Sequence, residues 1–271
     1  MGTEAEIYTP GKRITCETYL IHLPRYVFTS KFIKNNMDIL DIATGSGYGA
    51  SYLSGKGARN VVGADRDADI VQIANINYRK PNLSFMLANA EELPFSNESF
   101  DIVCSMGTID HLENPDKFLA GSKRIMRNGG YFICSVLNRE VITPSPFQQI
   151  IDPCHKIEYS PEELADLAGR YFNNVQLYYQ RSGNTRLIKT RRAMYFLLCR
   201  KLHLPNAFII LLQRFLWLSG NRDLRYMTYS EEAIDMDFTA DNEWIHVNST
   251  KMPAGIFNYL VVGQKETANT F

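Results

Sequence analysis

The feature that most constrains this sequence is a glycine-rich turn between an apolar segment and a helical one. Residues 39–43 are apolar apart from Asp41, and Gly45-Ser46-Gly47-Tyr48-Gly49 follows them. Glycines in such a turn let the backbone approach a ligand closely and aim free N–H groups at it. Asp65 closes the next apolar segment. The order strand, glycine turn, helix and acidic residue predicts a ligand-binding edge in an α/β domain.

Short apolar segments and helical-period segments alternate along most of the chain, which favours a parallel sheet covered on both faces. Strands are predicted at residues 39–43, 60–64, 83–87, 100–105, 131–136, 175–179 and 257–262. Helices are predicted at residues 50–56, 67 to about 79, 116–126 and 160 to about 171. Together these segments predict a Rossmann-like, doubly wound α/β sheet of seven strands.

The domain organisation follows from where this alternation stops. Residues 1–36 are predicted to form an N-terminal helical cap, residues 37–179 the core, residues 180–254 a mainly helical insertion, and residues 255–267 the last core strand. Within the insertion, residues 191–218 are apolar on nearly all sides of two short helices, so something must cover them. A lid or helical subdomain is the simplest interpretation; a homodimer interface and peripheral membrane contact are the alternatives.

Charge and hydropathy exclude several classes of protein. The 271 residues carry 29 basic and 29 acidic side chains, which gives no global electrostatic reason to expect a nucleic-acid partner. The start of the chain is polar and acidic, unlike a secretory signal, and the longest apolar stretch, Ala207 to Leu212, is far shorter than the roughly 20 residues of a membrane span. We therefore expect a cytoplasmic protein without a transmembrane segment.

No metal site is predicted from the spacing of cysteines and histidines. The five cysteines are scattered, without the close pairs of a zinc site, and are interpreted as reduced thiols. His203 and His246 likewise have no neighbours at ligand spacing.

The glycine turn and Asp65 would suit NAD and S-adenosylmethionine equally well, and a longer set of motifs separates the two. After Asp41, the turn and Asp65 come Asn89-Ala90-Glu91-Glu92-Leu93-Pro94-Phe95, then Ser99-Phe100-Asp101 and Gly129-Gly130. In this order and spacing, residues 37–140 resemble class I S-adenosylmethionine-dependent methyltransferases. The resemblance implies methyltransferase activity with S-adenosyl-L-methionine as cofactor.

The resemblance also implies a role for individual residues. The glycine turn would cradle the methionine part and ribose, Asp65 would accept bonds from the ribose hydroxyls, and Asn89 with Ala90 would contact adenine. Two positions depart from the family pattern, since Ala43 stands where glycine is usual and Asn89 where aspartate is more common. The implied cofactor-binding set is Arg25, Tyr26, Asp41, Ala43, Gly45, Gly47, Tyr48, Asp65, Arg66, Asn89, Ala90, Glu91 and Ser105.

Two members of this set lie before the core and have a second interpretation. Arg25 could pair with the methionine carboxylate, and Tyr26 could close over the cofactor from an N-terminal helix. The alternative is that Arg25 is a surface cation and that Tyr26 serves only in packing.

A narrower resemblance concerns the methyl acceptor. Thr9-Pro10, residues 22–28, Ser135-Val136-Leu137-Asn138 and residues 152–159 resemble bacterial methyltransferases associated with surface-polysaccharide synthesis. This implies a small-molecule or glycan acceptor, with methylation of a sugar hydroxyl or amine. Two positions depart from the closer members of this group. Gly107 stands where those proteins often have an acidic residue, and Asp110 stands where they have a glutamate.

Transfer of a methyl group to a hydroxyl requires a place for the hydroxyl proton to go. Asp110-His111 follows the fourth predicted strand and His155 follows the fifth, at the same edge of the sheet. The predicted catalytic residues are His155, His111 and Asp110, with a cofactor-side or structural role as the alternative for His111. Glu158 is expected to be a solvated or helix-end carboxylate, with a catalytic role as the alternative.

Two other functions remain open on the sequence alone. One is an NAD(P)-dependent sugar-modifying oxidoreductase, which the adenine motif does not favour. The other is a non-catalytic module that keeps the cofactor fold for interaction or regulation.

Overall fold

A computed structural model describes residues 16–139, 155–182, 242–246 and 258–267 of the chain. Most of the predicted insertion, including residues 191–218, lies outside the described residues. Residues 1–15 of the predicted N-terminal cap, which include Thr9-Pro10, also lie outside the described residues.

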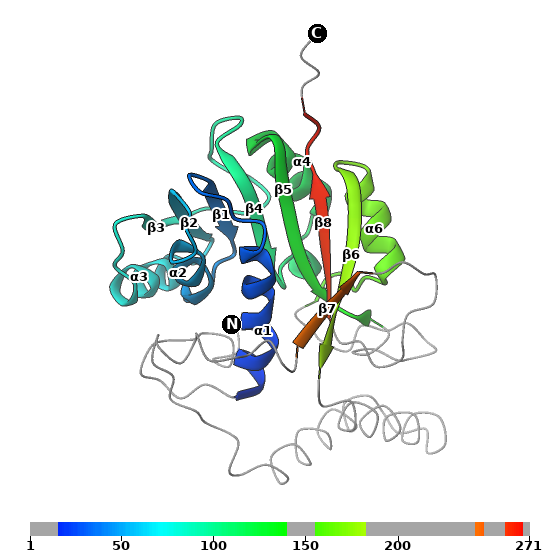
Figure 1. Ribbon diagram of the computed structural model, residues 1–271, viewed down its shortest axis with the longest axis horizontal. Helices are drawn as coiled ribbons and strands as arrows, with labels where there is room; N and C mark the ends of the chain where they lie inside the picture. The colour runs from blue at the N-terminus through cyan, green and yellow to red at the C-terminus, as the bar shows by residue number, and fades with distance from the viewer. Residues whose placement is uncertain (1–15, 140–154, 183–241, 247–257, 268–271) are drawn as a thin grey trace.

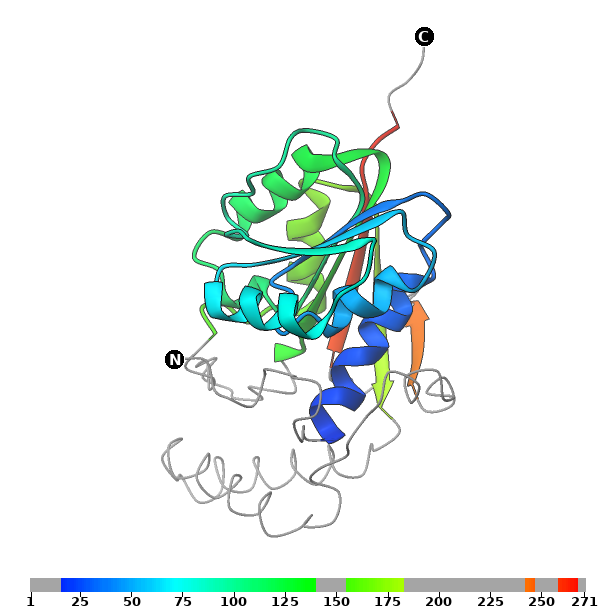
Figure 2. The ribbon, with the colours of Figure 1, turned by 90° about the vertical axis from the view of Figure 1, so that its left-hand side faces the viewer.

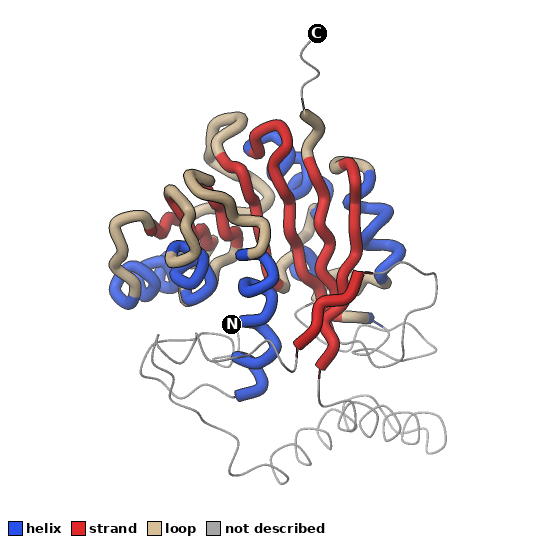
Figure 3. The backbone as a smooth tube through the Cα atoms, in the orientation of Figure 1, coloured by secondary structure: helices blue, strands red, loops and turns tan. Residues whose placement is uncertain are grey.

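The described core is a mixed sheet with the strand order β3-β2-β1-β4-β5-β8-β6-β7 (Figure 1; Figure 3). The first five of these strands are parallel, β8 is antiparallel to both β5 and β6, and β7 adds to the free edge of β6. The strands are β1 (Asp38–Ile42), β2 (Asn60–Asp65), β3 (Leu83–Leu87), β4 (Phe100–Met106), β5 (Met126–Leu137), β6 (Asn173–Ser182), β7 (Asn242–His246) and β8 (Asn258–Gln264). The Rossmann-like sheet predicted from the sequence is confirmed, with the short β7 as an additional edge strand.

Helices cover both faces of this sheet, and each face has its own apolar cluster (Figure 2). α1 (Cys16–Ser30), α2 (Tyr48–Ser54) and α3 (Ala68–Asn77) pack on one face, whereas α4 (Pro115–Ile125) and α6 (Pro161–Gly169) pack on the other. None of the helices in the described part of the chain has the length and apolar character that crossing a bilayer requires.

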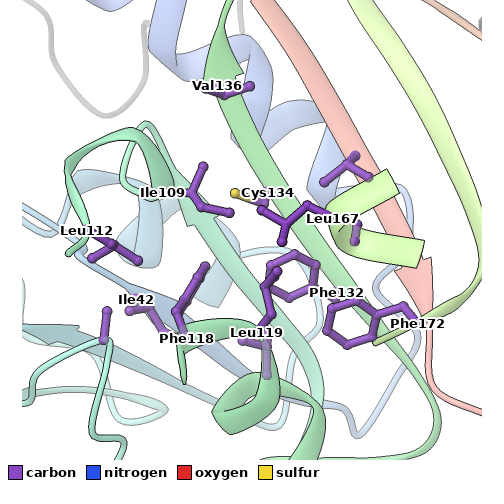
Figure 4. Close-up of a cluster of buried hydrophobic side chains, with 14 of the residues drawn as sticks. Ile42, Ile109, Leu112, Phe118, Leu119, Phe132, Cys134, Val136, Leu167 and Phe172 are labelled. Atoms are coloured by element: carbon purple, nitrogen blue, oxygen red, sulfur yellow. The ribbon is translucent and has the colours of Figure 1, made fainter. Parts of the chain in front are cut away.

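Aromatic side chains anchor the α4 and α6 face (Figure 4). The rings of Phe132 and Phe172 stack with centroids 4.6 Å apart, and Phe118 meets Phe132 edge-on at 5.7 Å. All three are fully buried, so each contributes roughly 1.5 to 3 kcal/mol of apolar burial to the fold. This packing fixes the position of β5, whose last residues lead to the candidate site.

Side-chain caps define the starts of two helices. Asp67 accepts backbone N–H bonds from Asp69 and Ile70 at the start of α3, and Ser160 forms a complete capping box with Glu163 at the start of α6. One boundary differs from the prediction: β5 begins at Met126, directly after α4, whereas the strand was predicted to begin at residue 131.

The carboxyl ends of the parallel strands meet at one edge of the sheet. β1 leads there into the glycine turn, β2 ends on Asp65, and β4 leads to the short 3-10 helix η1 (Ile109–His111). Ligands of open α/β sheets bind beside this edge.

Candidate functional site

The glycine turn and Asp65 are joined by hydrogen bonds at the carboxyl edge. The backbone N–H of Gly45 donates to Asp65 Oδ2 at 3.0 Å, and the N–H of Asp67 donates to Asp65 Oδ1 at 3.1 Å. Each carboxylate oxygen keeps a further lone pair, which suits two neighbouring hydroxyl donors. The arrangement holds the turn against the end of β2 and leaves Asp65 able to bind a ribose.

The surface of the turn has room for a ligand on one side and none on the other. Gly45 has φ 56°, and a Cβ atom built on it would meet nothing within 4 Å. Gly47 has φ 88°, and a Cβ atom there would lie 2.7 Å from the ring of Phe85. Between them, the buried hydroxyl of Ser46 has no hydrogen-bond partner among the described residues. Open backbone beside an unsatisfied hydroxyl fits the polar, adenosyl part of a cofactor.

Asp41 lies beneath the turn and is fully buried. Its Oδ2 accepts a bond from Thr44 Oγ1 at 2.7 Å, and its two oxygens lie 3.3 and 3.4 Å from the hydroxyl of Tyr26. Burial raises the pKa of Asp41 to about 7, against the opposing effect of these hydrogen bonds. Its role in the described structure is to tie Tyr26 and Thr44 to the end of β1.

Tyr26 packs directly under the glycine turn. A Cβ atom on Gly49 would lie 2.0 Å from the Tyr26 ring, so only glycine fits here. The ring also meets Tyr48 edge-on, with centroids 5.5 Å apart. These contacts are those of a packing residue, which is the second interpretation given above for Tyr26. The tyrosine ring shapes the turn from below.

Arg25, the residue before Tyr26, is buried as well. Its side chain is 1% exposed, so the interpretation as a surface cation is wrong. Burial lowers the pKa of Arg25, whereas the nearby Tyr48 and Asp110 favour its charged form. A Cβ atom on Gly107 would lie 3.4 Å from Arg25 Nη1. Arg25 thus lies between the cofactor side and the acceptor side of the candidate site.

Ala43 shows why glycine is usual at its position. Its φ is 55°, in the left-handed region that costs a side-chain-bearing residue roughly 1 to 2 kcal/mol. We expect Ala43→Gly to raise the free energy of unfolding by about 1 kcal/mol, as measured by urea denaturation. A lower stability of the variant would mean that packing of the alanine methyl outweighs the backbone strain.

The remaining predicted cofactor residues fall into two groups. Arg66 and Asn89 are exposed, and Asn89 Oδ1 accepts the N–H of Glu91 at 3.0 Å. Ala90, in contrast, is buried and belongs to the apolar cluster on the α4 and α6 face. Glu91 Oε1 accepts two backbone N–H groups just before α4, at 2.8 and 3.1 Å, and Ser105 Oγ donates to the backbone of β1 at 2.9 Å. Glu91 and Ser105 therefore position the walls of the site through the backbone.

The three predicted catalytic residues come together where the segment after β4 meets the segment before α6, on the predicted acceptor side. His155 Nε2 lies 3.5 Å from Asp110 Oδ2, and His111 Nε2 lies 4.0 Å from Asp110 Oδ1. His155 Nδ1 lies 3.2 Å from Glu158 Oε1. Glu158 is 4% exposed, so the expectation that it is solvated is wrong. We call Asp110, His111, His155 and Glu158 the acceptor-side cluster.

Backbone bonds hold the two halves of the acceptor-side cluster together. The N–H groups of Lys156 and Ile157 both donate to the carbonyl of Asp110, at 2.7 and 3.2 Å. Arg139 donates to the carbonyl of Glu158 at 3.1 Å. The segments after β4 and before α6 are therefore fixed relative to each other.

The individually predicted site residues did not include Glu158, Thr44 or Ser46. Glu158 follows His155 at a spacing of three residues, which was a usable signal for a hydrogen-bonded pair. Thr44 and Ser46 belong to the turn itself, but nothing in the sequence distinguishes their buried hydroxyls from solvated ones.

The fold and this edge define a class of protein: the sheet has the Rossmann-like architecture of class I methyltransferases. Residues 40–134 match the family model described as "Methyltransferase domain". A probable S-adenosylmethionine-dependent methyltransferase of Mycolicibacterium smegmatis is 34% identical over 131 residues, which are 48% of this chain and 49% of that protein. A ubiquinone biosynthesis O-methyltransferase of Cereibacter sphaeroides is 32% identical over 103 residues, or 37% and 41% of the two chains. The chain spans about half the length of the curated relatives it matches.

Solved structures agree in fold. A S-adenosylmethionine-dependent methyltransferase of Thermotoga maritima, described as a possible histamine N-methyltransferase, has a TM-score of 0.57 and 16% identity, covering 92% of this chain and 93% of its own. A phosphoethanolamine N-methyltransferase of Haemonchus contortus, in complex with S-adenosylhomocysteine, has a TM-score of 0.57 and 18% identity, covering 97% of this chain and 55% of its own. The family model and the sequence relatives support S-adenosylmethionine as the cofactor.

Proposed function

We propose that the chain is an S-adenosylmethionine-dependent methyltransferase that acts on a small-molecule or glycan hydroxyl or amine. The observation that carries the proposal is the hydrogen-bonded pair of glycine turn and Asp65, placed at the same sheet edge as the acceptor-side cluster. A cofactor and an acceptor that bind at these two places would share one edge. The match of residues 40–134 to the methyltransferase domain supports the same activity.

On the cofactor side, each residue has a defined task. Asp65 accepts bonds from the ribose hydroxyls, the open face of Gly45 lies along the ligand, and the Ser46 hydroxyl bonds to it. Asn89 and Ala90 receive the adenine. Arg25 pairs with the methionine carboxylate. The bound sulfonium supplies an activated methyl group.

On the acceptor side, the cluster orients the nucleophile and stabilises the charge that develops as its proton leaves. His155, His111 and Asp110 contact the acceptor, and Glu158 holds His155 in place. The resemblance to polysaccharide-associated methyltransferases favours a sugar hydroxyl or amine. The O-methyltransferase among the relatives supports oxygen as the methylated atom.

Residues 180–254 and the net charge of the chain bear on how the acceptor is bound and on what kind of molecule it is. Residues 180–254 would cover the acceptor as a lid, or pair two copies of the chain. The balanced charge of the chain agrees with an acceptor other than nucleic acid. The scattered cysteines, interpreted as reduced thiols, agree with a cytoplasmic enzyme.

A transfer assay tests the activity. Purified chain is incubated with S-adenosylmethionine labelled in its methyl group and, separately, with nucleotide-sugars, lipid-linked glycans and phenolic small molecules. We expect label in one acceptor class and release of S-adenosylhomocysteine. Tight binding of NAD without binding of S-adenosylmethionine would contradict the proposal, and cofactor binding without transfer to any acceptor would favour a non-catalytic module.

Asp65→Ala tests the cofactor side separately. We expect the dissociation constant for S-adenosylmethionine to rise about 10- to 50-fold, because the ribose loses a charged acceptor and Gly45 loses its anchor. Isothermal titration calorimetry measures the change. Asp67→Asn is the matched control, since Asp67 is exposed and asparagine caps a helix equally well. Equal affinities of the two variants would remove Asp65 from the site.

A further inference from the structure

We infer that Asp110, His111 and His155 bind a divalent transition-metal ion on the acceptor side. The inference rests on the proposed function, because it states how the cluster would activate the acceptor. One potential ligand atom from each of the three residues lies within 4.8 Å of the others. The cysteine and histidine spacing in the sequence did not predict this grouping, since His155 is brought to Asp110 only by the fold.

The distances within the cluster are close to those of a metal site. Ligand atoms about 2.0 to 2.1 Å from a tetrahedral zinc ion lie roughly 3.3 Å apart. His155 Nε2 and Asp110 Oδ2 are 3.5 Å apart, and His111 Nε2 and Asp110 Oδ1 are 4.0 Å apart. The His111 side chain is 31% exposed, and its ring centroid lies 4.9 Å from that of His155. Small side-chain movements would therefore bring all three atoms onto one ion.

A second observation points to a ligand at the same place. The Asp110 side chain is 2% exposed, and its Oδ1 has no hydrogen-bond partner among the residues that the structure describes. A buried carboxylate oxygen without a partner is costly, and buried charges are normally paired or bound to a metal. An ion between Asp110 and the two imidazoles would satisfy this oxygen.

Glu158 supplies the outer support that metal-binding histidines usually have. His155 Nδ1 lies 3.2 Å from Glu158 Oε1, and in the tautomer that donates Nδ1–H to this carboxylate the lone pair of His155 is on Nε2 and faces Asp110. A lone pair facing a carboxylate oxygen repels it unless a proton or a cation lies between them. An ion would account for the approach of both imidazoles to Asp110, whereas a proton on His155 would account only for the approach of His155.

The charge of the cluster agrees with a divalent ion. Among the described residues, Asp110 and Glu158 place two carboxylates in a buried region. The proposed function pairs Arg25 with the methionine carboxylate, so a doubly charged cation between neutral imidazoles would balance the charges of Asp110 and Glu158.

The donor set selects the type of ion. Two imidazole nitrogens and one carboxylate favour Zn²⁺, Mn²⁺ or Fe²⁺ over the oxygen-seeking Mg²⁺. Three protein ligands leave a position open, which an acceptor hydroxyl would occupy and so become more acidic. The hydroxyl proton then goes to water, the oxygen lone pair forms the new C–O bond, and the electrons of the broken C–S bond remain on sulfur.

Metal binding can be measured without methyl transfer. The full chain, without a histidine tag, is stripped with a chelator and dialysed against Zn²⁺. We expect about one ion per chain, about tenfold or more weaker binding in Asp110→Asn and in His155→Gln, and weaker binding of Mg²⁺ to the native chain. Glu98→Gln is the control, because Glu98 is an exposed carboxylate before β4, at the opposite edge of the sheet. Retained S-adenosylmethionine affinity shows that each variant is folded.

Two outcomes overturn the metal site: no stoichiometric binding of Zn²⁺, or binding that neither cluster variant weakens. A metal-free chain that transfers methyl groups at the full rate would also overturn the activating role of the ion while leaving the proposed function intact. Conversely, stoichiometric zinc binding by a chain that methylates no acceptor would reject the proposed function and not the site.

Discussion

His155→Gln is expected to lower kcat by about 100-fold while the dissociation constant for S-adenosylmethionine stays within about twofold. Glutamine is close to histidine in size but supplies neither the imidazole lone pair that faces Asp110 nor the ring held by Glu158. The loss falls on turnover because His155 belongs to the acceptor side, whereas Asp65 and the glycine turn hold the cofactor. Single-turnover kinetics and calorimetry separate the two quantities.

The matched control for this variant is its neighbour, Lys156→Gln. The Lys156 side chain is 52% exposed and pairs with Glu113, which is 73% exposed. Such surface pairs contribute little, so a rate close to that of the native chain is expected. If His155→Gln turned over as fast as Lys156→Gln, His155 would have no part in activating the acceptor.

The largest loss of stability is expected for Gly49→Ala, at about 3 kcal/mol in the free energy of unfolding. The added methyl group would lie 2.0 Å from the Tyr26 ring, which is 2% exposed and cannot turn into solvent without leaving Asp41. Relief of this overlap requires either α1 or α2 to move. Urea denaturation followed by circular dichroism measures the effect.

Gly45→Ala is the control for this prediction, since a methyl group there meets no atom within 4 Å and only the positive φ is strained. We expect a cost of about 1 kcal/mol for it. Combining Gly49→Ala with Tyr26→Leu should recover part of the lost stability, because the smaller side chain frees the space. Equal losses for the two glycine variants would mean that Tyr26 yields without cost and does not shape the turn.

The sequence was sufficient to predict the sheet and the cofactor edge because both depend on local patterns. The parallel strands are apolar over most of their length, the glycine turn is contiguous, and Asp65 follows β2 directly. Capping residues such as Ser160 also act within a few positions of themselves. The additional edge strand β7 gave no comparable signal, since it pairs with β6 across a long stretch of chain.

The buried positions of the polar residues could not be predicted in the same way. Arg25 and Glu158 are residue types that usually face solvent, and their burial depends on contacts across the fold. The approach of Tyr26 to Gly49, and of His155 to Asp110, likewise depends on how helices and loops pack against the sheet. Sequence reasoning therefore found the residues of the acceptor side but not their arrangement.

Consecutive residues of α1 reach different halves of the site: Tyr26 supports the glycine turn, and the charge of Arg25 acts on Asp110. A change in the tilt or register of this one helix would alter the grip on the methyl donor and the electrostatics around the acceptor together. Exchanging the helix between relatives should therefore transfer both properties as a unit, and selection for a new acceptor through α1 would carry a cost in donor affinity.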